Sequence, residues 1–233
     1  MPVPASTDLR ALAAEVSDCR ACPRLVAWRE HVATEKRAAF RTERYWARPV
    51  PGFGDPAARL IVVGLAPAAH GGNRTGRIFT GDRSGDFLFA SLHRTGYANQ
   101  PTSVARDDGL RLSGCYIAAA VRCAPPANKP TPGERDECRP YLVRELELLA
   151  RLRAVVALGA FAYDAVWAAL RAAARELPAR RPRFGHGVEV RAGALTILCS
   201  FHPSQQNTFT GKLTPAMLDA VFERARVVSG GSG

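Results

Sequence analysis

The sequence contains no long apolar run. No stretch approaches the ~18 consecutive apolar residues of a membrane-spanning helix. The N-terminal segment also lacks a basic stretch followed by an apolar core, which is the pattern of a secretory signal. We therefore expect a cytoplasmic protein with no membrane partner.

Acidic residues are scarce relative to basic ones. The chain has 32 Lys and Arg against 21 Asp and Glu, which gives a formal net charge of +11. A high share of Arg is typical of GC-rich genomes, but exchanging Lys for Arg does not raise the net charge. Because basic side chains that neutralise phosphates release counterions, the excess predicts a nucleic-acid partner and a nucleoid-associated protein.

Several patterns that would indicate other chemistry are missing. The chain has neither the phosphate-binding P-loop nor the dinucleotide-binding fingerprint. It also lacks the acidic cluster with which nucleotide hydrolases hold a metal ion, and the three-cysteine motif of radical enzymes. These absences disfavour nucleotide hydrolysis and radical chemistry.

Short apolar runs alternate with helical patterns along the chain. The runs cover residues 60–63, 116–121, 154–158 and 195–200, and the helical patterns cover 86–95, 132–152, 161–176 and 215–228. Continuous apolar runs are typical of strands buried on both faces, and their alternation with helices indicates parallel β-α units. We predict an α/β fold, a three-layer α/β/α sandwich with a central four-stranded parallel sheet. Ligands bind beyond the carboxyl ends of such strands.

The length of 233 residues suits one domain with one hydrophobic core. We expect that domain to cover residues 1–228 and to be monomeric, with residues 229–233 as a flexible tail. Residues 98–112 are expected to form a surface excursion, and residues 177–187 a basic loop.

Four of the six cysteines are spaced as ligands of one metal centre. Cys19 and Cys22 form a C-x-x-C pair, and Cys123 and Cys138 flank a proline-rich loop that is able to bring them together. Four thiolates fit either tetrahedral zinc or a [4Fe–4S] cluster, and the spacing does not decide between them. The alternative is a set of unrelated buried thiols. A metal centre here is expected to staple the chain rather than to react.

The other two cysteines, Cys115 and Cys199, lie inside apolar runs, where a thiol packs as a small hydrophobic side chain. Disulfides are not expected among the six, because the cytosol keeps thiols reduced. These two positions are therefore predicted to lie outside any metal site.

A glycine-rich loop follows the first apolar run. Residues 64–82 contain five glycines, which is typical of a loop whose backbone approaches a ligand closely. Near its end, Phe79 is a candidate platform for stacking and Asp82 a candidate base. The alternative is that Phe79 belongs to the core and that Asp82 caps the next helix.

A histidine follows the last apolar run. His202 and the small polar residues that come after it are placed to form a donor to a developing anion and a loop that enters DNA. A single histidine is more often a polar residue with internal partners, so its role depends on what lies beside it.

Taken together, these segments resemble a family-five uracil-DNA glycosylase, the B-type enzyme within the uracil-glycosylase superfamily. The resemblance covers nearly the whole chain, from about Cys19 to the last helix. Its motifs, in order along the chain, are the Cys19/Cys22 pair and residues 45–54, 64–71, 73–77, 79–82, 121–126, 128–130 and 202–208.

The resemblance implies a structural [4Fe–4S] cluster held by an N-terminal segment and the core of the chain. Its ligands are Cys19, Cys22, Cys123 and Cys138. Many relatives carry a polar residue in the first loop, whereas this chain reads Gly-Leu-Ala-Pro from Gly64. The B-type pattern lacks that polar residue and uses the aspartate that corresponds here to Asp82.

The resemblance and the chemistry together imply a set of catalytic and pocket residues. Phe79 is expected to stack on the flipped base while the Asn128 amide reads its polar edge. His202 is expected to donate to the carbonyl oxygen that gains charge, and Asp82 to position water and shield the cationic sugar. The backbone of Gly64, Ala66 and Ala68 is assigned to the same pocket.

The remaining expectations concern DNA and the range of bases. Asn73 and Arg74 are candidates for phosphate or pocket contacts, and Gln205, Gln206 and Asn207 for entry into the minor groove. The partner is DNA that contains uracil or other deaminated bases, with hypoxanthine, xanthine and etheno-cytosine as further substrates implied by the resemblance. The competing interpretations are an iron–sulfur redox protein and a non-catalytic DNA-binding module stapled by zinc.

Overall fold

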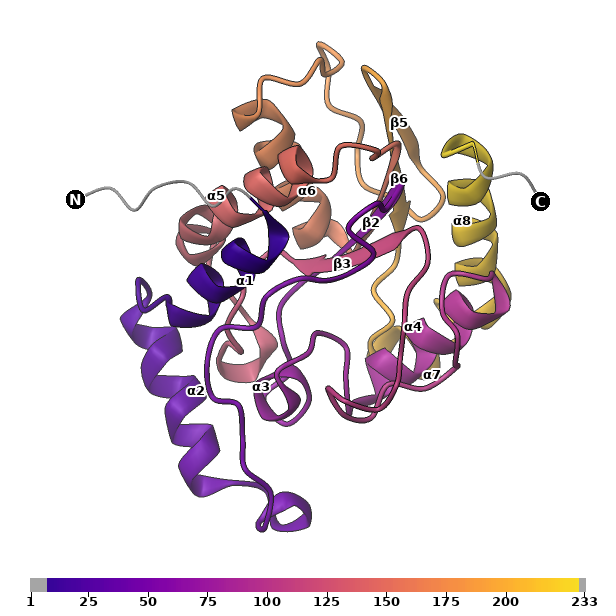
Figure 1. The fold of residues 1–233 in the computed structure, drawn as a ribbon. Coiled ribbons are helices and arrows are strands. Elements are labelled where there is room, and N and C mark those ends of the chain that lie inside the picture. The colour runs from indigo at the N-terminus through magenta and orange to yellow at the C-terminus, as the bar shows by residue number, and fades with distance from the viewer. Residues whose placement is uncertain (1–7, 231–233) are drawn as a thin grey trace.

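A six-stranded sheet forms the centre of the molecule (Figure 1). The structure is a computed structural model and describes residues 8–230. The strand order is β1-β3-β2-β4-β6-β5. The strands are β1 (Phe53–Gly54), β2 (Leu60–Gly64), β3 (Cys115–Ala119), β4 (Ala154–Leu158), β5 (Glu189–Ala192) and β6 (Leu195–Ser200).

The central strands β3, β2, β4 and β6 are parallel, as predicted from the apolar runs. The outer strands β1 and β5 pair antiparallel with β3 and β6 and were not predicted. Strand β1 has only two residues, and β5 alternates exposed and buried positions, so neither shows the continuous apolar run of a central strand.

Helices cover both faces of the sheet, which confirms the three-layer architecture (Figure 1). The helices are α1 (Leu9–Asp18), α2 (Pro23–Glu35), α3 (Gly72–Thr75), α4 (Arg83–Arg94), α5 (Pro132–Leu148), α6 (Ala160–Ala172), α7 (Gln205–Phe209) and α8 (Pro215–Val228), with short 3-10 turns η1 (Ala38–Phe40) and η2 (Pro126–Asn128). Helices α5 and α6 pack on one face, and α4 and α8 on the other.

The alternation of side chains along β2 explains why both faces need a cover. Ile61 and Val63 join the core under α5 and α6, whereas Leu60 and Val62 join the core under α4 and α8. All four side chains are fully buried. Burying a side chain of this size contributes about 1.5–3 kcal/mol, so the strand is held from both sides.

The starts of α5 and α8 follow directly from the sequence. Each begins with a proline after a threonine whose hydroxyl accepts a backbone N–H, and Thr131 forms a full capping box with Glu134. Helix α2 was not predicted, because its apolar residues are interrupted by polar ones and its buried face includes Arg29. Within residues 8–230, no helix is long and apolar enough to cross a membrane.

Two segments outside the regular elements differ in packing from what the sequence suggests. Ser229 is buried and the carbonyl of Gly230 accepts a hydrogen bond from Arg59, whereas both were placed in the predicted tail. Residues 231–233 lie outside the described part of the chain. The excursion 98–112 contains only an isolated bridge between Ala98 and Leu112, but Ser103 within it is fully buried.

Candidate active site

A cavity of about 510 Å³ opens at the carboxyl ends of the parallel strands. Loops that follow β2, β3, β4 and β6 all contribute to its wall, as the position of the predicted residues at strand ends requires. The residues predicted for the site that line it are Ala66, Ala68, Phe79, Asp82, Asn128, His202 and Gln206.

Phe79 is held in the cavity wall by two glycines. Its backbone has φ +55°, a left-handed conformation that a phenylalanine rarely adopts. A side-chain carbon at Gly64 would lie 2.6 Å from the Phe79 ring, and one at Gly85 would lie 1.9 Å from the Phe79 carbonyl oxygen. Gly64 therefore acts by admitting the ring and does not itself line the cavity. The ring of His202 is 5.9 Å from that of Phe79, centroid to centroid.

Asp82 is a helix cap and also a residue of the cavity wall, so the predicted cap is confirmed and the carboxylate still borders the cavity. One carboxylate oxygen accepts the backbone N–H of Gly85 at 3.0 Å, at the first turn of α4. The other lies against Gly71, where a side-chain carbon would come within 2.2 Å of it. Burial raises the pKa of Asp82, and the hydrogen bond from Gly85 partly offsets this rise.

His202 is a neutral imidazole in this site. Burial lowers its pKa from the ordinary 6.5 to about 4. Within residues 8–230, neither of its ring nitrogens has a hydrogen-bond partner. A neutral imidazole carries one N–H group, so His202 is able to donate a hydrogen bond to a ligand oxygen.

Asn128 sits at the exposed rim of the cavity in the turn η2. Ala127 and Asn128 both have positive φ, +52° and +55°. The backbone N–H of Asn128 donates to the carbonyl of Pro125 at 3.2 Å. Asparagine tolerates this conformation better than most residues. The turn leaves the side-chain amide of Asn128 free to face the cavity, which it lines.

Three of the four predicted ligand cysteines pack in one cluster. Cys22, at the start of α2, Cys123, after β3, and Cys138, on α5, share contacts. Cys19, which follows α1, lies within electrostatic range of Cys22 and Cys123. In the part of the chain that the structure describes, no group of three or more His, Cys, Asp or Glu side chains is arranged to hold a metal ion.

A buried cation accompanies these thiols. The guanidinium of Arg29 is almost fully buried and donates to the Cys123 sulfur at 2.9 Å. Burial raises the pKa of the Cys123 thiol to about 11 and that of Cys138 to about 12. Thiolates at these positions therefore require positive charge nearby, which Arg29 supplies in part and a bound metal centre would complete. Four thiols of this kind are the ligand type that a thiolate-bound centre takes, although the described side chains are not arranged around one point.

A family model of the uracil DNA glycosylase superfamily matches residues 51–226. The chain belongs to the uracil DNA glycosylase superfamily. This confirms the resemblance that the sequence motifs indicated.

Several relatives within this superfamily are close in sequence. The type-5 uracil-DNA glycosylase of Mycobacterium tuberculosis is 57% identical over 222 residues, which cover 94% of this chain and 81% of the relative. The type-5 enzyme of Thermus thermophilus is 51% identical over 226 residues, covering 96% of this chain and 99% of the relative. That of Pyrobaculum aerophilum is 47% identical over 213 residues, with 91% and 90% covered.

Two residues predicted to contact DNA in this member of the glycosylase superfamily instead make hydrogen bonds within the protein. Asn73 is fully buried and its amide donates to the carbonyl of Arg29 at 3.2 Å, so it cannot reach a DNA backbone in this conformation. Arg74 is largely buried, pairs with Glu43 at 2.5 Å and donates to the carbonyls of His70 and Gly81. Both side chains fasten the glycine-rich loop rather than face outward.

Helix α7 carries the other predicted DNA contacts. Gln205 and Gln206 are exposed, and Gln206 lines the cavity. Asn207 turns back and donates to the carbonyl of His202 at 2.8 Å, so it supports the histidine loop.

The sequence analysis did not identify Phe209 at the end of α7. This residue is 71% exposed and its ring lies against the Arg83 guanidinium. The signal was an aromatic residue in an otherwise polar segment.

Proposed function

We propose that this chain is a DNA-repair glycosylase that flips uracil out of DNA and hydrolyses its N-glycosidic bond. Water adds to the sugar carbon, the bond to the base breaks, and the base leaves as an anion that then takes up a proton, which leaves an abasic site. The observation that carries the proposal is that Asp82, His202 and Phe79 line one cavity at the strand ends. The type-5 relatives, named as uracil-DNA glycosylases, support it.

The two titratable residues, His202 and Asp82, have different roles because one is neutral and the other is negatively charged. His202, neutral because it is buried, donates to the uracil carbonyl oxygen that becomes negative. A preorganised donor of this kind is typically worth roughly 3 kcal/mol in the transition state. Asp82, as a carboxylate, holds the attacking water and shields the positive charge that grows on the sugar. The cap from Gly85 fixes the orientation of that carboxylate.

Base selection in the proposed site depends on the rim and on the small residues of the wall. Asn128 at the rim reads the polar edge of the base, and Phe79 stacks on its face. Ala66 and Ala68 leave room in the wall where larger side chains would exclude a purine. We therefore propose hypoxanthine, xanthine and etheno-cytosine as further substrates.

The four cysteines are proposed to hold a [4Fe–4S] cluster. Cys19 follows α1, Cys22 precedes α2, Cys123 follows β3 and Cys138 lies on α5, so a cluster there would join the N-terminal helices to the sheet. When bound, the cluster supplies a structural crosslink and takes no part in hydrolysis. Arg29 balances its thiolate charge through Cys123.

The pH dependence of excision is expected to follow Asp82 and not His202. Because the carboxylate form acts, the rate falls as pH is lowered through the pKa of Asp82, which burial places above its ordinary 3.8. His202 has a pKa of about 4, so no inflection is expected near the ordinary 6.5 of histidine. Single-turnover rates between pH 4 and pH 9 measure this. An inflection near 6.5 that disappears in His202→Gln would contradict the neutral-donor role.

Phe209→Ala is expected to weaken binding to duplex DNA with an abasic site by roughly tenfold, because a stacked aromatic contributes about 1–3 kcal/mol per base. The exposed ring stands at the end of α7, whose Gln206 lines the cavity. Val227→Ala is the matched control, since Val227 is 65% exposed on α8. Fluorescence anisotropy gives both affinities. Equal affinities for the two variants would place DNA elsewhere on the surface.

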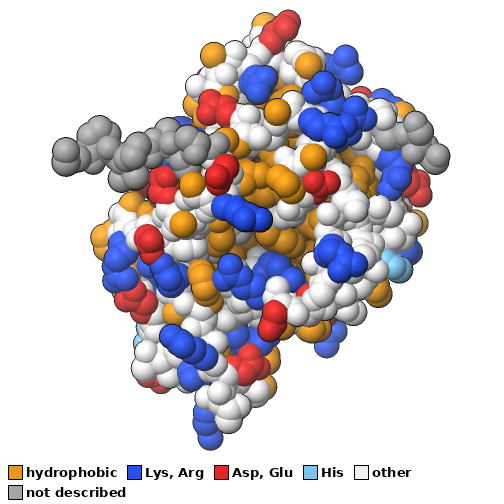
Figure 2. Space-filling model, in the orientation of Figure 1, with side chains coloured by type: hydrophobic (Ala, Val, Ile, Leu, Met, Phe, Trp, Pro, Cys, Tyr) orange, Lys and Arg blue, Asp and Glu red, His pale blue; other side chains and the backbone are white. Residues whose placement is uncertain are grey.

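Charge on the surface is consistent with a DNA partner. Figure 2 shows Lys and Arg side chains spread over one face of the molecule, with acidic side chains among them. A net charge of +11 attracts DNA at low salt even where the basic side chains are not gathered in one patch.

The test of the proposed function is base release from a duplex that holds one uracil, in EDTA, followed by alkaline cleavage of the abasic site. We expect strand cleavage at the uracil and none in a duplex with thymine at that position. Absence of cleavage, in duplexes and single strands with uracil or hypoxanthine, would refute the glycosylase. Reversible reduction or bound zinc would then identify the redox or the DNA-binding alternative.

A further inference from the structure

The excursion 98–112 lies directly behind the turn that carries Phe79 and Asp82. It contributes no residue to the cavity wall. Its contacts include Arg77 and also Thr80 and Gly81, the two residues that separate Phe79 from Asp82 in the chain. Whatever holds those two residues therefore sets the spacing between the stacking platform and the carboxylate.

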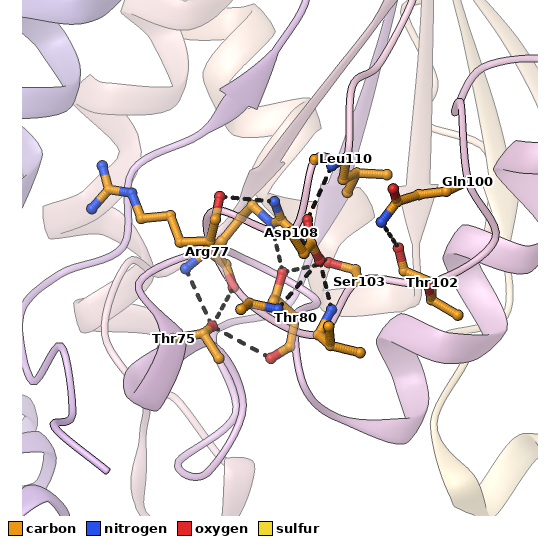
Figure 3. Close-up of polar contacts among 12 residues, drawn as sticks. Thr75, Arg77, Thr80, Gln100, Thr102, Ser103, Asp108 and Leu110 are labelled. Carbon is orange, nitrogen blue, oxygen red and sulfur yellow. Dashed lines mark hydrogen bonds and ion pairs between the residues drawn. The ribbon is translucent and has the colours of Figure 1, made fainter.

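Ser103 holds both of them (Figure 3). Its hydroxyl lies 2.7 Å from the Thr80 hydroxyl, and its carbonyl accepts the backbone N–H of Gly81 at 2.8 Å. Ser103 and Thr80 are both fully buried. A buried hydroxyl pair of this kind has no water to replace a lost partner, so its geometry is well determined.

Arg77 and Asp108 fix Ser103 in turn (Figure 3). The Arg77 guanidinium donates to Ser103 at 2.8 Å, to Thr80 at 3.0 Å and to the Asp108 carboxylate at 2.7 Å. Asp108 also accepts the backbone N–H of Val104 at 2.8 Å. Arg77 lies in the glycine-rich loop, so the network ties the two ends of the turn to the excursion.

The turn needs such support because its backbone is strained. Phe79 has φ +55°, and a strained conformation persists only where its surroundings over-determine it. On one side, Gly85 of α4 approaches the Phe79 carbonyl so closely that no side chain fits. On the other side, Ser103 contacts both Thr80 and Gly81, while Arg77 also donates to Thr80 and Arg74 to the Gly81 carbonyl.

We propose that Ser103 and Asp108 are positioning residues for base excision. They hold Phe79 and Asp82 at the spacing that a flipped nucleotide requires, without touching it. The proposal rests on the glycosylase function proposed above. Because misplacement of a reacting group by about 1 Å costs up to roughly a hundredfold in rate, the effect of losing them falls on chemistry rather than on binding.

Ser103→Ala and Asp108→Asn test this. We expect each to lower the single-turnover rate of uracil excision by roughly 10- to 100-fold while the dissociation constant for abasic DNA stays within about twofold. The chain offers a matched control in α4 and α8, where Ser91 and Arg94 both donate to Asp219. Ser91→Ala and Asp219→Asn remove the same kinds of contact away from the turn and should leave the rate unchanged.

A purely structural role predicts a different result. If Ser103→Ala and Asp108→Asn lower only the melting temperature, to the extent that the control variants do, and keep the wild-type rate, the proposal is wrong. Thr80→Ser keeps the hydroxyl and should keep the rate, whereas Thr80→Val should lose it; this pair decides the matter if Asp108→Asn does not fold. A wild-type chain without activity on uracil would instead overturn the proposed function.

Discussion

Asp82→Asn is expected to slow uracil excision by roughly 10²- to 10⁴-fold, the range of a positioned acid–base group. The change removes the negative charge but leaves the shape of the side chain. Asparagine caps helices as well as aspartate does, so the bond from Gly85 and the start of α4 remain. The loss therefore reports on the charge beside the water and the sugar, not on the fold.

The measurement pairs single-turnover excision with the affinity for abasic DNA. We expect the affinity to change by no more than about twofold, because the carboxylate acts on the transition state rather than on the bound product. Asp8→Asn is the control, since Asp8 also caps a helix, α1, and accepts two backbone N–H groups there. Losses of equal size in rate and in affinity would show that Asp82 serves binding and would end its catalytic assignment.

The position of Asp82 explains why a capping role and a catalytic role do not compete. One oxygen accepts a hydrogen bond from the helix, and the other lies close to Gly71, where a side chain would not fit. The cap thus fixes the carboxylate through one oxygen and leaves the other oxygen for the proposed role in excision. Burial raises the pKa of the group, yet the hydrogen bond from Gly85 limits the rise.

The central architecture was predictable because each central strand is buried on both faces and reads as an apolar run. Proline after a capping threonine fixed the starts of α5 and α8 in the same local way. The edge strands β1 and β5 lack that signal, and α2 hides its helical face because Arg29, a charged residue, is buried there. Local sequence patterns therefore predicted the three layers but missed β1, β5 and α2, which form because of tertiary contacts.

The same difference between local sequence patterns and tertiary contacts applies to the residues predicted for the site. Phe79, Asp82, Asn128 and His202 follow strands that end at one edge, and strand ends converge whatever the detail of packing. Asn73 is different, because a polar residue in a glycine-rich loop looks the same in sequence whether it faces DNA or the carbonyl of Arg29. Arg74 and Ser103 pose the same problem, and only the folded contacts separate them.

Cys123→Ser is expected to abolish the brown colour and the solubility of the protein. Cys123 is buried in the loop that follows β3 and accepts a hydrogen bond from Arg29. Serine is a poor ligand for iron at neutral pH because its hydroxyl stays protonated, and its shorter side chain weakens the contact of the buried Arg29 cation, which then depends on the carbonyl of Cys19. If the proposed cluster is the link between the N-terminal helices and the sheet, the free energy of binding it is also free energy of folding.

The other buried thiols provide the control for this change. Cys115 in β3 and Cys199 in β6 are fully buried and belong to the hydrophobic cores, away from the cysteines that share contacts with Cys22. Cys115→Ala and Cys199→Ala are therefore expected to keep the colour, although each loses some stability to the cavity it creates. A difference between Cys123→Ser and these variants isolates ligation from packing.

Iron analysis of the purified chain decides between the metal alternatives. A [4Fe–4S] cluster predicts about four iron atoms per chain, with absorption near 400 nm, and a strong reduction of both in Cys123→Ser. Zinc at about one atom per chain, in a colourless wild-type protein, would assign the four thiols to a tetrahedral site instead. A Cys123→Ser variant that is well folded and still excises uracil, but carries no metal, would show that the packing of the N-terminal helices against α5 holds them in place without a metal centre.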